Sequence, residues 1–184
     1  EKAALANWRE RVGFKEANRI KTEASTRGTL MHSYIEDFLR GRVNESFFET
    51  NEQYKIMAKE IIDKGLNGRL EEIYGIEETI YYPDQYAGTA DLLAKMNGVD
   101  VCIDFKQANK PKKSDFIQDY FLQLGAYTLG HDVVHGTKMK AGIILLCTQD
   151  ILFQEFKIEG AELEMYQNLF MGRVKKFYEL NNIS

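Results

Sequence analysis

The sequence contains few cysteines and no long apolar segment, and both absences narrow the class of protein. Its two cysteines, Cys102 and Cys147, lie in apolar strand-like segments of a 184-residue chain. Two isolated cysteines do not favour a metal site, and an iron–sulfur cluster normally needs four. We therefore expect reduced core thiols and a reducing compartment. No apolar segment reaches the roughly 20 residues of a membrane-spanning helix, so we expect no membrane contact.

The chain also lacks an excess of basic residues, since its formal net charge is −4. Contact with nucleic acid would therefore depend on a local basic patch. The chain is 44% hydrophobic and 28% charged, which is typical of one compact globular domain. No signal peptide is recognisable. Because the sequence starts at Glu1 without a methionine, whether a segment precedes it stays an open question.

The most informative stretch is residues 88–106, in which two apolar segments flank Asn97-Gly98. Asn-Gly between apolar segments predicts an antiparallel hairpin. Each strand carries one acid, Asp91 and Asp104, and the hairpin brings the two acids side by side. Lys106 lies two residues after Asp104, so both side chains are expected on the same face of the strand.

Charged side chains in apolar strands are unfavourable unless they are paired or bound to metal. Two interpretations therefore stay open. One is a buried salt bridge between Asp104 and Lys106. The other is a site for Mg²⁺ or Mn²⁺, which prefer carboxylate oxygens and retain several waters.

Hydrophobic periodicity predicts a single α/β domain whose residues 1–75 are helical and whose residues 76–184 form the core with a mixed sheet. The expected helices cover residues 1–12, 25–39, 50–74, 116–129 and 161–180. The expected strands cover residues 76–82, 86–96, 99–105, 141–147 and 151–156. Ser25 or Thr26 is expected to cap the second helix, and His131 and His135 are expected in a loop.

Other polar residues have two interpretations each. His32 and Glu36 lie one turn apart at the edge of an apolar helical stripe, either as structural residues or as metal ligands. A basic stretch at Lys15, Arg19 and Lys21 is either a solvated helix face or a phosphate-contacting surface. The same alternatives apply to the lysines that flank Pro111, which are Lys110, Lys112 and Lys113.

Four segments occur in an order and spacing typical of one enzyme family. They are the helix Gly28–Glu36 with His32, the strand Gly88-Thr89-Ala90-Asp91, the element Ile103-Asp104-Phe105-Lys106, and the helix Gln123–Tyr127. Together they resemble the PD-(D/E)XK nuclease superfamily, specifically its RecB-like branch, which includes mitochondrial genome maintenance and phage-encoded exonucleases. Pro83-Asp84 also matches the Pro-Asp pair in the family's name. These two residues are typical of a turn, so Asp91 is favoured as the aspartate of the site.

The resemblance implies hydrolysis of DNA with Mg²⁺ or Mn²⁺ on a PD-(D/E)XK core of about five strands. The implied metal ligands are His32, Asp91, Asp104 and the backbone carbonyl of Phe105. Glu36 would either bind a second ion or hold His32 in position. The implied catalytic residues are Asp91, Asp104, Lys106, Gln123 and Tyr127. The implied DNA contacts are Arg27, Lys110, Lys112 and Lys113.

The expected substrate is the end of a single DNA strand, threaded beneath an arch of N-terminal helices, in replication, recombination or DNA degradation. Bases would stack on aromatic side chains such as Trp8, Phe14, Tyr120 and Phe121. The alternatives are a structure-specific endonuclease and a catalytically silent DNA-binding subunit of a recombination complex. Whether a helicase or an annealing protein is a partner stays an open question. The cytoplasm of a bacterium or phage-infected host is favoured over the mitochondrial matrix.

Overall fold

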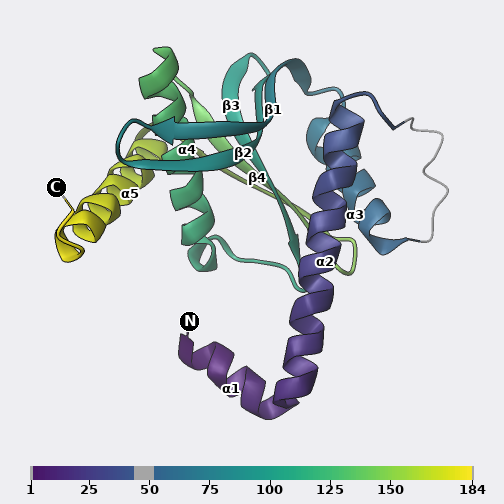
Figure 1. Cartoon of the computed structure of the whole chain (residues 1–184). Helices are drawn as coiled ribbons and strands as arrows, with labels where there is room; N and C mark the ends of the chain where they lie inside the picture. Colours follow the sequence, from purple (N-terminus) through teal and green to yellow (C-terminus); the bar gives the residue numbers. More distant parts are fainter. Residues whose placement is uncertain (1, 44–51, 184) are drawn as a thin grey trace.

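The computed structural model describes residues 2–43 and 52–183, which form one five-stranded sheet with helices on both faces (Figure 1). The elements in chain order are α1 (Lys2–Val12), α2 (Phe14–Leu39), α3 (Gln53–Ile61), the π-helical turn η2 (Ile62–Leu66), β1 (Leu70–Tyr82), β2 (Tyr86–Met96), β3 (Val99–Ala108), the 3₁₀ turn η3 (Ser114–Phe116), α4 (Gln118–His135), β4 (Ala141–Thr148), β5 (Phe153–Glu159) and α5 (Gly160–Leu180). The predicted α/β class and five-stranded sheet are confirmed.

The sheet has the strand order β1-β2-β3-β4-β5. Only β3 and β4 run parallel, so the sheet is mixed as predicted. The hairpin β2–β3 turns at Asn97 and Gly98, both with positive φ (50° and 76°). That conformation is the one that Asn-Gly favours in a two-residue hairpin turn, so the local sequence fixes the register that aligns Leu92 with Ile103.

Alternating side chains of the sheet divide the core between two helical layers. On one face, Leu92, Ile103 and Phe105 pack with residues of α2 and α3. On the other face, Leu93 and Cys102 pack with residues of α4 and α5. Both cysteines are buried free thiols, as expected. None of the helices in the two described ranges combines the length and hydropathy needed to span a membrane.

The predicted helix over residues 50–74 is wrong in its last third, because the helical segment ends at Leu66. Its predicted start at Thr50 lies outside the described residues, and β1 already begins at Leu70. Leu70 and Ile73 have helical spacing, but β1 is an edge strand with much of its length in solvent, so a clear strand alternation is missing. Gly68, at φ +71°, ends the helical segment before them.

Two further helix boundaries differ from the prediction. Helix α2 begins at Phe14, so Ser25 and Thr26 lie inside it and cap nothing. Arg19 there pairs with two acids one turn away in either direction, which supports the polar stretch as helix. Helix α4 continues through His135 to a left-handed Gly136, so His131 and His135 are helical and not in a loop.

Candidate active site

The sheet opens between β2 and β3 at the two predicted aspartates. Backbone pairing ends at Leu92 and Ile103, and Asp91 and Asp104 are the next residues along this register. The Phe105 N–H donates instead to Asp91 Oδ2 over 2.8 Å. A carboxylate therefore takes the place of a ladder carbonyl, and the two acids face each other at the fork.

Burial makes this carboxylate pair electrostatically unfavourable. Asp91 is 8% and Asp104 3% exposed. Desolvation, followed by the neighbouring Asp104 carboxyl, raises the pKa of Asp91 from 3.8 to about 8, although the Phe105 N–H opposes the shift. A proton or a cation is therefore required to stabilise the pair near neutral pH.

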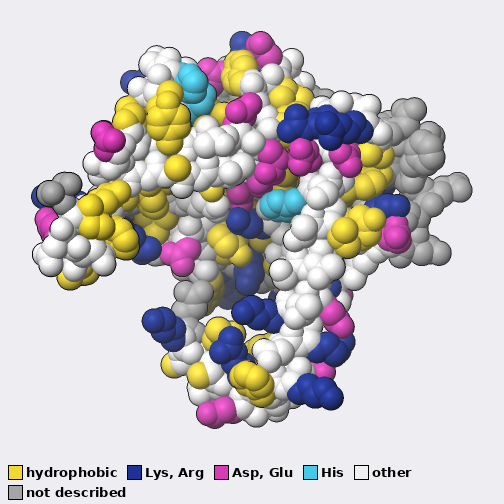
Figure 2. Space-filling view, in the orientation of Figure 1, with side chains coloured by type: hydrophobic (Ala, Val, Ile, Leu, Met, Phe, Trp, Pro, Cys, Tyr) yellow, Lys and Arg dark blue, Asp and Glu magenta, His cyan; other side chains and the backbone are white. Residues whose placement is uncertain are grey.

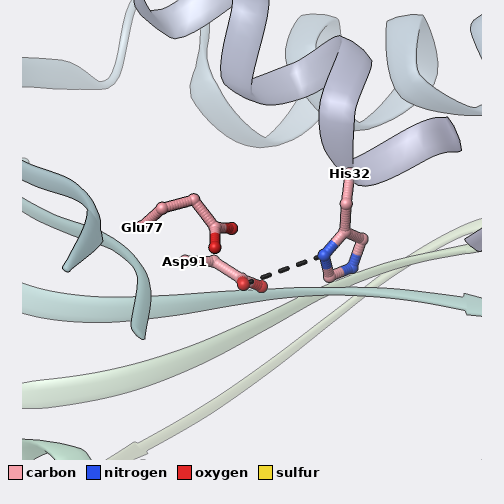
Figure 3. Close-up of side chains that lie close together, drawn as sticks. All are labelled: His32, Glu77 and Asp91. Carbon is pink, nitrogen blue, oxygen red and sulfur yellow. Dashed lines mark ion pairs between the residues drawn. The ribbon is translucent and has the colours of Figure 1, made fainter. Parts of the chain in front are cut away.

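His32 reaches the same fork from α2. Its Nε2 donates a hydrogen bond of 2.5 Å to the Phe105 carbonyl oxygen, which leaves Nδ1 as the ring's free acceptor. Nδ1 lies 3.7 Å from Asp91 Oδ1, as the dashed line in Figure 3 marks. Metal-binding histidines commonly fix their second nitrogen on a carbonyl in this way.

The Phe105 carbonyl, predicted as a metal ligand, thus also orients His32. A carbonyl oxygen has two lone pairs, so the contact with His32 leaves the second available to a cation. Carboxylate oxygens, a carbonyl oxygen and one imidazole nitrogen form a donor set that suits a hard divalent ion such as Mg²⁺ or Mn²⁺. The residues gathered at the fork fit the predicted cofactor.

Glu77 of β1 was missed by the sequence reasoning. One ligand atom each of His32, Glu77 and Asp91 lie within 4.8 Å of one another, and Figure 3 shows the three side chains around one space. In the sequence, Glu77 falls among the polar positions of the strand predicted over residues 76–82. Its position opposite Asp91 follows from the β1–β2 register, which the sequence does not give directly.

Lys106 lies on the β3 side of the fork. Its amine is 2.7 Å from Asp104 Oδ2 and lies 4.9 Å from the ring centre of Tyr120. Burial opposes the charged amine, but the Asp104 carboxylate outweighs this, so the pKa of Lys106 is raised. Lys106 therefore acts as a fixed positive charge and not as a free base.

Two residues of α4 hold that amine in place. Lys106 donates to Gln123 Oε1 over 3.1 Å, and Gln123 Nε2 donates to the Tyr127 hydroxyl over 2.8 Å. Because an ammonium can only donate, the Gln123 amide has one orientation that satisfies both contacts. Burial raises the pKa of Tyr127, so its hydroxyl keeps its proton.

Gly88 explains the glycine of the Gly88–Asp91 strand motif. A Cβ at this position would lie 2.7 Å from Cε1 of the Tyr127 ring, well inside van der Waals contact. The missing side chain on β2 therefore makes room for the tyrosine of α4. Two segments nearly forty residues apart in sequence are linked by a direct packing requirement.

The remaining predicted residues lie around this centre. Glu36 Oε1 accepts from Arg40 Nε over 2.8 Å, and is not in the His32 ligand group. Arg27 of α2 donates to Gln107 and Asn109, where β3 enters the next loop. That loop carries the three predicted lysines, of which Lys110 and Lys113 are exposed and Lys112 is partly buried.

The fold matches the crystal structure of a candidate exonuclease from Eubacterium rectale with a TM-score of 0.53. The two are 15% identical over 86% of this chain and 69% of that chain. Weaker likenesses are to SSO0001 (TM-score 0.45, 13% identity, 95% of this chain and 70% of that chain) and to an alkaline exonuclease from Laribacter hongkongensis (TM-score 0.32, 15% identity, 68% and 66%). No protein-family model and no curated protein matches the chain. At this identity, the chain shares the fold of the Eubacterium rectale protein.

Proposed function

We propose that this chain is a metal-dependent DNA exonuclease of the RecB-like PD-(D/E)XK branch that degrades single strands from their ends. The observation that carries the proposal is the fork between β2 and β3, where Asp91 and Asp104 meet His32 and Lys106. A shared fold with a candidate exonuclease supports it. DNA binding alone would not require buried carboxylates next to a phosphate backbone.

Each residue has a distinct role in the proposed reaction. Asp91, Asp104, His32 and the Phe105 carbonyl would hold Mg²⁺ or Mn²⁺, which when bound makes water a better nucleophile and neutralises phosphate charge. Lys106 stabilises the extra negative charge that develops on the phosphate during attack. Gln123 and Tyr127 fix the Lys106 amine so that no reorientation is needed during the reaction.

The shape of the molecule supports a single strand as substrate. Residues 2–27, which comprise α1 and the first half of α2, form an N-terminal arm that extends away from the sheet (Figure 1). Between this arm and the loop after β3 lies a hollow of about 640 Å³, lined by residues that include Ala4 and Lys112. A flexible single strand fits such an opening more readily than a stiff duplex.

The opening is basic although the chain is acidic. The N-terminal arm carries seven basic and three acidic side chains. Figure 2 shows Lys and Arg side chains gathered around the hollow between the arm and the sheet. This local patch meets the condition for contact with nucleic acid in a chain of net charge −4.

Aromatic side chains at the opening supply surfaces for base stacking. Phe116 lines the hollow and is 78% exposed, and Phe14 at the bend of the arm is 72% exposed. Tyr120, predicted as a stacking residue, instead covers the Lys106 amine. Phe121, also predicted to stack on bases, is buried against Phe156 and Tyr166, so that prediction is wrong.

Digestion of end-labelled DNA tests the proposal. With Mn²⁺ we expect loss of linear single strands, survival of circular single strands, and no cleavage in EDTA. Asp104→Asn should abolish cleavage, whereas Asp84→Asn, in the exposed Pro83-Asp84 turn, should retain it. Equal digestion of circular and linear strands would indicate an endonuclease, and cleavage in EDTA would contradict metal dependence.

The basic loop can be tested separately from catalysis. Replacing all three lysines by glutamine should weaken binding of a single-stranded oligonucleotide and flatten its salt dependence by up to about two units of slope. The replaced residues are Lys110, Lys112 and Lys113. Binding can be measured by fluorescence anisotropy in EDTA over a salt series. An unchanged slope would exclude this loop from the DNA path.

A further inference from the structure

The register of the sheet places three acids side by side on adjacent strands. Ile76 pairs with Leu92 and Glu78 with Ala90, so Glu77 of β1 lies opposite Asp91. Asp104 follows on the other side of Asp91. Asp91 is therefore flanked by a carboxylate on each neighbouring strand. Among the residues that the structure describes, a lysine compensates the charge on the Asp104 side alone.

Glu77 has a backbone conformation that separates it from the rest of β1. Its φ is +52°, a left-handed value that residues with a side chain rarely adopt. This brings a Glu77 carboxylate oxygen within 4.8 Å of ligand atoms of both His32 and Asp91. In Figure 3 the Glu77 side chain, on an exposed residue, turns toward the two others.

The segment before Glu77 is held from α2. Arg40 Nη2 donates to the Ile76 carbonyl oxygen over 3.0 Å, and Arg40 Nε pairs with Glu36. Within residues 2–43 and 52–183, no hydrogen bond or ion pair involves the Glu77 carboxylate itself. The backbone next to Glu77 is therefore fixed, while its carboxylate faces another acid without a basic partner.

We propose that Glu77 is a further ligand of the divalent cation that His32 and Asp91 hold, supplied by β1 outside the four sequence segments that define the site. Two carboxylates and one imidazole nitrogen that converge on one space form a donor set for Mn²⁺ or Mg²⁺. This proposal rests on the proposed metal-dependent function. Glu36 then acts on Glu77 indirectly, because it orients Arg40, which holds the carbonyl of Ile76.

Calorimetric titration of the purified chain with MnCl₂, without DNA, tests this role. Glu77→Gln should weaken Mn²⁺ binding by about tenfold or more, whereas the neighbouring exposed Glu78→Gln should bind like the original chain. Glu77→Gly separates ligation from folding. Because glycine accepts φ +52° freely, it should raise the melting temperature in EDTA and still weaken Mn²⁺ binding.

The outcomes distinguish this inference from the proposed function. If Glu77→Gln binds Mn²⁺ as tightly as the original chain while Asp91→Asn does not bind it, Glu77 is not a ligand and the metal-dependent function stands. If the original chain binds no Mn²⁺, both the inference and the metal-dependent function are overturned.

Discussion

Replacing Asp91 by asparagine should stabilise the protein in the absence of metal, and the effect should grow with pH. Asparagine has the same shape, and its side-chain oxygen can still accept the Phe105 N–H. The substitution removes the ionisable group whose charged form is unfavourable because of burial and the nearby Asp104. The predicted gain is therefore electrostatic.

The sign and size follow from the raised pKa of Asp91. Between pH 4 and pH 8 the unfolded chain has lost this proton, whereas the folded chain, with a pKa of about 8, retains it. Stability therefore falls as pH rises through this window. The penalty is about 2 kcal/mol at pH 5 and about 4 kcal/mol at pH 7, from 1.36 kcal/mol per pH unit. At pH 7 it corresponds to a difference in melting temperature on the order of 10 °C.

Thermal unfolding of both proteins in EDTA, from pH 5 to pH 8, measures this difference. Asp84→Asn is the control, because Asp84 is exposed in a turn and should change little. In Mn²⁺ the original chain should gain stability and Asp91→Asn should not, since a bound cation favours the charged carboxylate. A variant that is less stable than the original chain in EDTA at every pH would refute the reasoning.

Two other substitutions probe Lys106 and the α4 residues that hold its amine. Lys106→Met should reduce cleavage by about a hundredfold or more. Mn²⁺ binding should persist, because the amine competes with the cation for Asp104. Loss of Mn²⁺ binding in calorimetry would contradict this role. Gly88→Ala should displace Tyr127 and destabilise the fold by about 1–3 kcal/mol. Gly172→Ala is its matched control, since nothing lies within 4 Å of a Cβ there and alanine favours helix. Equal urea midpoints for the two variants would exclude the proposed packing of Gly88.

The hairpin of the site was predictable because its information is local. Asn97-Gly98 sets the turn, the turn sets the register, and the register brings Asp91 and Asp104 together. The strand alternation then places Lys106 beside Asp104. Five residues at fixed spacings were sufficient for this part of the structure.

The position of Glu77 was not predictable, because it depends on interactions that are distant in sequence. Helical spacing at Leu70 and Ile73 hid the start of β1, and only the sheet determines which residue faces Asp91. The left-handed backbone of Glu77 is likewise stabilised by surrounding structure, since glutamate has no local preference for it. Such non-local contacts leave little trace in one sequence.

Helix α1 buries none of its residues, and this has a consequence for how the protein can change. A helix outside the hydrophobic core contributes little to the stability of the fork between β2 and β3. If the chain degrades DNA from its ends as proposed, substitutions in residues 2–12 can therefore alter which ends are admitted with little loss of stability. Selectivity at the entrance and chemistry at the fork can evolve independently of each other.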